Sequence, residues 1–139
     1  MRLESLLREH SGMKIERPPE LWEADAEEAL LLPLVAEMIA AAIHRGAVLH
    51  ELTLSASNVE VEPSEYDEDH LFPHPGEYVA LTVSGQIDLG PDDTWHPGSE
   101  AGDGVLGALA GRLTTARARF AYVRRISPYG SVTVYFTRW

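Results

Sequence analysis

Apolar side chains recur along this chain with two different periods, and each period predicts a different kind of element. In the first third of the chain the apolar residues fall every three or four positions, which is typical of a helix with one buried face. The stripe consists of Leu30, Leu31, Leu34, Val35, Met38, Ile39, Ala42 and Ile43. Asp25 is expected to cap this helix and Gly46 to end it. Pro33 either kinks the helix or is its first residue, with Leu32 as the cap.

From residue 47 onward, apolar and polar residues alternate, which is the period of a half-buried strand. The alternation predicts strands over residues 47–55, 59–62 and 78–89. The phase changes at Ser57-Asn58, so we expect a bulge or turn there, and Gly85 is expected to bend the third strand.

Another helix is predicted from Asp103 to Ala116. Its apolar positions are Leu106, Leu109 and Leu113, and its glycines Gly104, Gly107 and Gly111 fall on one side. Glycine weakens a helix, so these positions indicate that another part of the chain packs close to the helix backbone. The last segment reads as a β-hairpin over residues 120–136 with its turn at 127–130.

The first 24 residues predict a short helix that ends near His10, followed by a connector in which Pro18-Pro19 excludes a helix. Ile15, Leu21 and Trp22 are the expected anchors of this connector.

Together the elements predict an α+β two-layer sandwich, with a mainly antiparallel sheet of four to five strands and helices on one face, ending in a β-hairpin. A length of 139 residues suits one domain over residues 1–139, with residues 1–24 packed on its body.

The two signs of charge are separated along the chain. Residues 51–103 hold thirteen Asp or Glu and no Lys or Arg, whereas residues 104–139 hold six Arg and no acid. The net charge is −11 at pH 7. Such a single-sign segment repels itself unless something opposes it, so it predicts a role in surface electrostatics and a basic protein partner.

Composition also bears on the compartment. The chain has no cysteine, which fits a reducing compartment, and we expect a cytoplasmic protein. Its longest apolar run, residues 29–36, is too short to cross a bilayer, so no membrane association is expected.

The acidic segments 60–77 and 88–103 are therefore the predicted binding surface of a non-catalytic protein-binding module, of inhibitor, immunity-protein or adaptor type. Small acidic inhibitors of nucleases use charge in this way to speed encounter with a basic partner. The residues of this surface are Glu65, Tyr66, Asp67, Glu68, Asp69, Asp92, Asp93 and Trp95.

A metal-assisted enzyme or small-ligand-binding protein is the alternative. Imidazole and carboxylate are ligands that Zn²⁺ and Mn²⁺ accept, and the candidates here are His70, His74, Asp92 and His96. If both acidic loops leave the same edge of the sheet, they converge on one pocket with Trp95 and Tyr66 as walls. The spacing matches no known ligand pattern, and an acidic stretch rich in proline is more often a solvated loop.

Residues 102–107 match the GxGxxG pattern of dinucleotide-binding proteins, but their context does not. No strand leads directly into them, and no acid follows Asp103 to bind a ribose. A phosphate-binding loop of the Gly-Lys-Ser/Thr type is excluded because the only lysine is Lys14. We therefore predict no cofactor.

The terminal hairpin intersperses arginines with aromatic residues, which is one way in which single-stranded RNA is bound. An acidic protein repels polyanions, so we predict no nucleic-acid binding. The simplest interpretation is that these arginines pair with the protein's own acids and that the aromatics are core. Another is homo-oligomerisation, with the Arg-rich C-terminal hairpin of one copy against the acidic loops of another.

Overall fold

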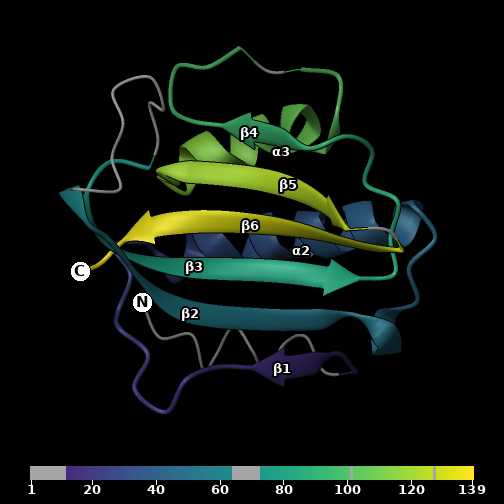
Figure 1. Ribbon diagram of the computed structural model, residues 1–139, viewed down its shortest axis with the longest axis horizontal. Helices are drawn as coiled ribbons and strands as arrows, with labels where there is room; N and C mark the ends of the chain where they lie inside the picture. The colour runs from purple at the N-terminus through teal and green to yellow at the C-terminus, as the bar shows by residue number, and fades with distance from the viewer. Residues whose placement is uncertain (1–11, 64–72, 101, 127) are drawn as a thin grey trace.

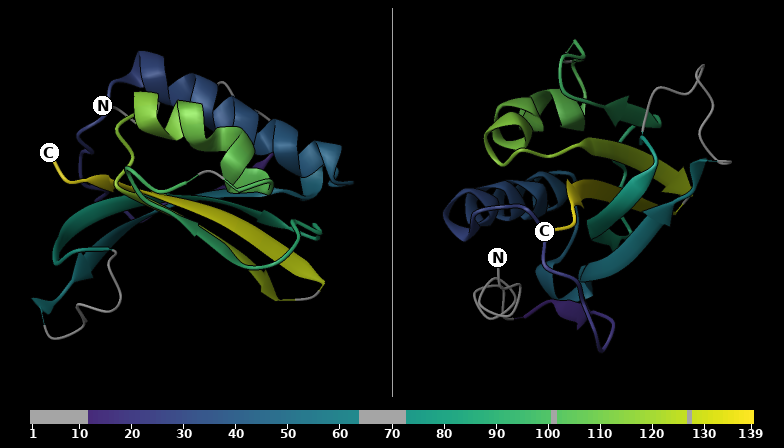
Figure 2. Two further views of the ribbon diagram at one scale, coloured as in Figure 1. Left: turned by 90° about the horizontal axis from the view of Figure 1, so that it is seen from above. Right: turned by 90° about the vertical axis from the view of Figure 1, so that its left-hand side faces the viewer.

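The computed structural model describes residues 12–63, 73–100, 102–126 and 128–139. These residues form a six-stranded mixed sheet with two helices on one face, an α+β sandwich (Figures 1 and 2). In chain order the elements are β1 (Lys14–Glu16), α2 (Glu28–His44), a 3-10 turn (Leu49–Glu51), β2 (Thr53–Val61), β3 (Gly76–Gly85), β4 (Asp93–Trp95), α3 (Val105–Thr115), β5 (Phe120–Ile126) and β6 (Tyr129–Thr137). The predicted fold class is confirmed, whereas the predicted first helix falls on residues 1–10, outside the described residues.

The sheet has the strand order β1-β2-β3-β6-β5-β4, and every neighbouring pair is antiparallel except β1 and β2. The two short edge strands, β1 and β4, account for the difference from the predicted four to five strands. Each has only three residues, which is too few for a periodic pattern to appear. The chain ends in the predicted hairpin, formed by β5 and β6.

Helix α2 buries the predicted stripe against the sheet. Its buried residues are Leu31, Leu34, Val35, Met38, Ile39 and Ala42, whereas Ile43 is exposed. Pro33 lies inside the helix and is not its first residue. The residue before the helix is Glu27, and no side chain caps the amide groups of the first turn, so the predicted Asp25 cap is wrong.

Strand β2 runs without a bulge through Ser57-Asn58, contrary to the prediction. Its pairing with β3 is continuous from Thr53 to Val61. The phase of the apolar residues changes because a polar residue, Asn58, takes the position at which Leu54 and Ala56 predict a buried side chain. The Asn58 side chain accepts from the backbone N–H of Trp22 at 2.9 Å and donates to the Glu20 carbonyl at 2.8 Å, so it fastens the connector to the sheet.

Helix α3 buries Leu106, Leu109 and Leu113 as predicted. Gly104 rather than Asp103 precedes its first residue, and no side chain caps it. Of the three aligned glycines, only Gly107 is tightly packed, because the carbonyl of Gly102 occupies the space that a Cβ would need.

Helix α3 ends at Thr115, and Arg117, two residues later, takes the left-handed conformation with φ of 61°. The hydrogen bonds from Ala118 N to the Leu113 carbonyl and from Arg117 N to the Thr114 carbonyl form a Schellman motif. Glycine is the usual residue at this position, because a Cβ there is strained.

The sheet has two unlike faces, because side chains alternate along each strand. One face packs under the helices and carries most of the core, including Leu81, Val134 and Phe136, all with 0% exposure. The face that α2 and α3 leave uncovered, which we call the open face, is turned toward the viewer in Figure 1 and lies opposite both helices in Figure 2. Tyr78, Ala80 and Phe120 are buried, yet they lie outside the core cluster on this second face.

Candidate functional site

Four aromatic rings meet on the open face. Register places Phe120 beside Tyr135 across β5 and β6, with the ring centroids 5.7 Å apart. Tyr122 lies 6.1 Å from Tyr135, and Tyr78 lies 5.8 Å from it on the other side. Centroid separations of this size are those of favourable aromatic pairs. Tyr135 is therefore the centre of an aromatic cluster that consists of Tyr78, Phe120, Tyr122 and Tyr135.

Two tyrosines of this cluster, Tyr78 and Tyr135, have a pKa that is raised above the ordinary value. Burial, reinforced by the neighbouring Tyr122, raises the pKa of Tyr135 to about 12. Burial also raises the pKa of Tyr78, against the opposing effect of Arg119. The Tyr78 hydroxyl donates to the backbone carbonyl of His74 at 2.6 Å and so fixes the end of the first acidic loop on the open face.

Beside the cluster lies a hollow of about 470 Å³. Phe120, Tyr122 and Tyr135 line it from the sheet, and Asp92 and Asp93 line it from the second acidic loop. Pro73, at the end of the first acidic loop, also lines it. Pro73 of the first acidic segment and two acids of the second therefore line the same hollow. Of the two walls that the convergence hypothesis named, Tyr66 lies outside the described residues and Trp95 is not among the lining residues.

A smaller hollow of about 190 Å³ adjoins the first one. Pro73 lines both hollows, and Pro75, Glu77 and Tyr78 line the smaller one. We call the two hollows together the open-face groove. Its floor is aromatic and its rim carries both acids and arginines, which is a composition typical of a recognition surface.

The rim acids are held by local hydrogen bonds. One oxygen of Asp92 accepts from the backbone N–H of Arg125 at 2.7 Å, and one oxygen of Asp93 accepts from the N–H of Thr94 at 2.9 Å. Both side chains belong to exposed residues. Arg124 lies over the Tyr122 ring, with its guanidinium carbon 4.9 Å from the ring centroid. The Asp92 carboxylate thus keeps a fixed orientation at the hollow. Asp93 lies on the same face of β4 as Trp95, and one of its carboxylate oxygens lies 3.9 Å from the position that a Cβ of Gly104 would take, at the start of α3.

The residues of the predicted acidic binding surface do not all lie on the surface of the protein. Asp92 and Asp93 are exposed and line the groove. Glu65, Tyr66, Asp67, Glu68 and Asp69 lie outside the described residues. The prediction for Trp95 needs correction, because its side chain is only 4% exposed and belongs to the core. Strand β4 is at the edge of the sheet, but alternation turns Trp95 toward the helices and Thr94 toward the open face.

The predicted metal ligands are not brought into one cluster in the described part of the chain. His70 lies outside that part, and in the remainder no group of three His, Asp or Glu residues is suitably placed to bind an ion. His74 lines the smaller hollow and Asp92 the larger one. The ring of His96 contacts the carbonyl of Pro97 at 3.1 Å.

Arginines of the C-terminal region pair in part with the protein's own acids, as the simplest interpretation predicted. Arg125 lies 3.8 Å from Asp88, and Arg138 pairs with Glu77. Arg138 also stacks on the ring of Trp22, at 4.2 Å from its centroid. Both acids belong to residues 51–103, so arginines near the C-terminus neutralise part of the acidic charge of that segment in the folded protein.

Tyr122 and Tyr135 are the aromatic residues that the sequence interpretation misplaced. They were expected to be core, but they are only partly buried, because they alternate with core residues such as Val123 and Phe136 and so face the other way. Phe120 shares this face and is buried. The alternation of large aromatics with small residues was the available signal. It showed two apolar faces on β5, and only one of them is covered by the described helices.

The glycine pattern at residues 102–107 does not form a dinucleotide site. The strand before it, β4, pairs antiparallel with the strand after it, β5, whereas a dinucleotide-binding unit needs parallel strands joined through the helix. The Gly102 carbonyl packs against Gly107, so the loop closes on the helix itself.

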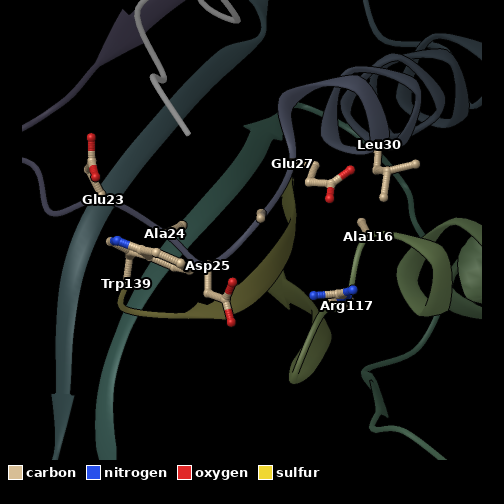
Figure 3. Close-up of a pocket in the computed structure, with 9 residues that line it drawn as sticks. Glu23, Ala24, Asp25, Glu27, Leu30, Ala116, Arg117 and Trp139 are labelled. Carbon is tan, nitrogen blue, oxygen red and sulfur yellow. The ribbon is translucent and has the colours of Figure 1, made fainter.

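A second pocket, of about 400 Å³, lies where α2 begins and α3 ends (Figure 3). Trp139 and Asp25 line one wall, and Leu30, Ala116 and Arg117 line another (Figure 3). Trp139 is 80% exposed. This pocket shares no lining residue with the open-face groove.

Comparison with known proteins supports the fold alone. No family model matches the chain, and no curated protein sequence matches it. A solved structure of the mycobacterial sensor histidine kinase MprB is similar, with a TM-score of 0.51 and 12% sequence identity. The similarity covers 99% of this chain and 91% of that chain. In the described residues, no helix is long and apolar enough to span a membrane.

Proposed function

We propose that this chain is a non-catalytic protein-binding module whose acidic rim and open-face groove engage a basic protein. The observation that carries the proposal is the aromatic hollow that Pro73 of the first acidic segment lines together with Asp92 and Asp93 of the second. Aromatic side chains supply contact area at the centre of protein interfaces, and surrounding charges select the partner.

The charge of the described residues supports a basic partner. They hold sixteen Asp or Glu and nine Lys or Arg. Internal pairing with Arg125 and Arg138 involves Asp88 and Glu77, while Asp92 and Asp93 receive backbone N–H groups, which leaves their net charges in place. A field of this sign attracts a basic protein over roughly 8 Å at physiological salt. We place the protein in the cytoplasm, since it has no cysteine.

The test begins with the partner that co-purifies from the native host. Charge reversal of Asp67, Glu68 and Asp69, on the acidic segment, should slow its association, whereas truncation of Tyr122 should mainly speed its dissociation. Trp95 is not suitable for this test, because its buried side chain supports the core. Retention of the same partner at an unchanged association rate by the folded, charge-reversed protein contradicts the proposal.

A metal-assisted enzyme or small-ligand-binding protein that uses His70, His74, Asp92 and His96 is the second candidate. Asp92 lines the larger hollow and His74 lines the smaller one, and both residue types are ligands that Zn²⁺ and Mn²⁺ accept. A metal assay on protein purified without chelator separates the two candidates. A stoichiometric metal supports the enzyme, whereas the binding module predicts none.

Self-association is a third candidate, supported by two exposed apolar residues at the hairpin tip. Ile126 is 74% exposed and Tyr129 is 56% exposed. If the hairpin of one copy contacts the acidic rim of another, light scattering at low salt should give a mass that falls to that of the monomer at high salt.

A further inference from the structure

The open face of the sheet is almost free of charge. Side chains alternate along a strand, so every second residue of β2, β3, β5 and β6 points to this face. Among the described residues of these four strands that do so, Arg124 is the only charged one, whereas 24% of the residues of the whole chain are charged. Depletion of charge together with an excess of aromatic residues is typical of the buried centre of a protein interface.

The open face carries an apolar projection at one end and an aromatic hollow at the other. The projection is the hairpin tip, where Ile126 and Tyr129 are register partners and are 74% and 56% exposed. At the opposite end of β5 and β6, the aromatic cluster borders the hollow of about 470 Å³. The projection and the hollow are therefore complementary in kind, and both belong to the same face.

Short hydroxyl side chains fill the middle of the face. They form two rows across the strands, with Thr53, Ser84 and Ser131 in one row and Ser55, Thr82 and Thr133 in the next.

Another surface can cover these rows at little cost. The hydroxyls of Thr82 and Thr133 lie 2.8 Å apart and bond to each other, and Thr133 is already only 4% exposed. A buried hydroxyl that keeps its partner avoids the cost of an unsatisfied polar group. Short side chains also allow a second sheet to approach to the usual spacing of about 10 Å.

We propose that the open face is the interface between two copies of this chain, which pack sheet against sheet about a two-fold axis. The axis lies between the two sheets and crosses the strands at the hydroxyl rows. On β6 an extended strand separates Tyr129 from Tyr135 by about 20 Å, with Ser131 and Thr133 between them. The axis therefore brings the hairpin tip of each copy onto the aromatic end of the other, which is the self-complementary contact of an isologous dimer.

The size of the face suits such a dimer. Four strands about 4.8 Å apart and about nine residues long cover roughly 19 by 30 Å, or about 570 Å² in projection. Side-chain relief adds to this area, so each copy approaches the roughly 800 Å² that a stable interface buries per partner. An uncharged face offers little by which an unlike partner could be selected through charge complementarity, whereas a second copy supplies both the projection and the hollow.

This inference goes beyond the proposed function, because it needs no partner protein. A basic partner that enters the open-face groove would displace the second copy, since both need the aromatic end of the face. Self-association through the acidic rim is a different contact, because it depends on charge and this one does not; salt therefore separates the two. If the copies do not associate, the test of the basic partner is unaffected, so the two proposals fail separately.

The experiment is sedimentation velocity on the full chain without any partner, from about 1 to 200 μM protein and at about 50 and 500 mM salt. Ile126→Ser/Tyr129→Ser removes the projection, and both residues are exposed, so the fold does not depend on them. Tyr122→Ser changes the aromatic end. Ile43→Ser/Val48→Ser is the matched control, because both residues are apolar and 45% exposed and neither belongs to the open face. Thermal unfolding confirms that each variant is folded.

The wild type should reach twice the mass of the 15.3 kDa chain as its concentration rises. The tip variant and Tyr122→Ser should each raise the Kd of the dimer at least about tenfold, while the control variant changes it by less than about twofold. The higher salt should change the wild-type Kd by less than about threefold. A wild type that stays monomeric at the highest concentration overturns the inference, and so does a dimer that high salt dissociates or that the folded tip or Tyr122 variant leaves intact.

Discussion

Two glycines of the same helix should respond to alanine with opposite signs. At Gly107 a new Cβ would overlap the backbone carbonyl of Gly102, and a backbone atom cannot move aside as the end of a flexible side chain can. At Gly111, one helical turn later, no atom lies within 4 Å of the position of a new Cβ.

The magnitudes follow from two opposing effects. Alanine is favoured over glycine inside a helix by about 1 kcal/mol, and this gain applies to both positions. Overpacking against a closely fitted neighbour costs about 3 kcal/mol when the overlap is with backbone. We therefore expect Gly107→Ala to destabilise the protein by about 2 kcal/mol and Gly111→Ala to stabilise it by about 1 kcal/mol. The melting temperatures of the two variants should then differ by about 10 °C.

Urea titration monitored by circular dichroism measures both free energies of unfolding. The slopes should match the wild type, since neither change alters the surface exposed on unfolding. If Gly107→Ala proves as stable as Gly111→Ala, the residue 102 loop does not pack on α3, and the explanation of the aligned glycines is wrong.

Three further substitutions test other parts of the fold. Leu34→Ala should lower the free energy of unfolding by about 2–5 kcal/mol, because the Leu34 side chain is fully buried. Leu32 is partly exposed, so a larger loss of stability for Leu32→Ala in the same urea titration would show that the helix is rotated. Arg117→Gly should stabilise by about 1 kcal/mol, since glycine relieves the strain of the positive φ; a melting temperature below that of the wild type would show that the arginine side chain makes a stabilising contact. The pKa of Tyr135 rises from 10.0 to about 12 on burial and by the neighbouring Tyr122, so its stabilising effect is complete below pH 10 and is lost as pH rises toward 12. Tyr135→Phe should therefore lose less stability than the wild type between pH 9 and pH 12, and parallel curves would contradict this.

The class of fold could be predicted because periodicity reports burial directly. Apart from Leu30 and Ile43, the stripe on α2 faced the core as predicted, and so did the leucines of α3 and the apolar positions of β3 and β6. Strand β2 was misinterpreted at Asn58 because a polar residue took a core-facing position for the sake of hydrogen bonds to the connector. A period records which positions are apolar and does not record such long-range bonds.

The candidate site was only half predictable. Asp92 and Asp93 stood out as acids in a loop, and their exposure needed no tertiary information. Tyr122 and Tyr135 are large aromatic residues of a kind that also occurs in cores. They differ from Val123 and Phe136 in the face of the sheet on which they lie, and the sequence does not tell which face the helices cover. Trp95 was wrongly placed on the surface for the complementary reason, since it stands in a polar loop sequence and yet turns into the core.

The central claim is that the acidic rim of the open face draws in a basic protein, and the association rate tests it most directly. The rate of the co-purified partner should be measured by stopped flow from about 50 to 500 mM salt, for the wild type, Asp92→Asn/Asp93→Asn and Glu20→Gln/Glu23→Gln. The account predicts a wild-type rate that falls steeply with salt, a dissociation rate that changes little, and a shallower slope only for the variant at the rim. Equal slopes for all three proteins would contradict it and leave the acids as a solubilising surface.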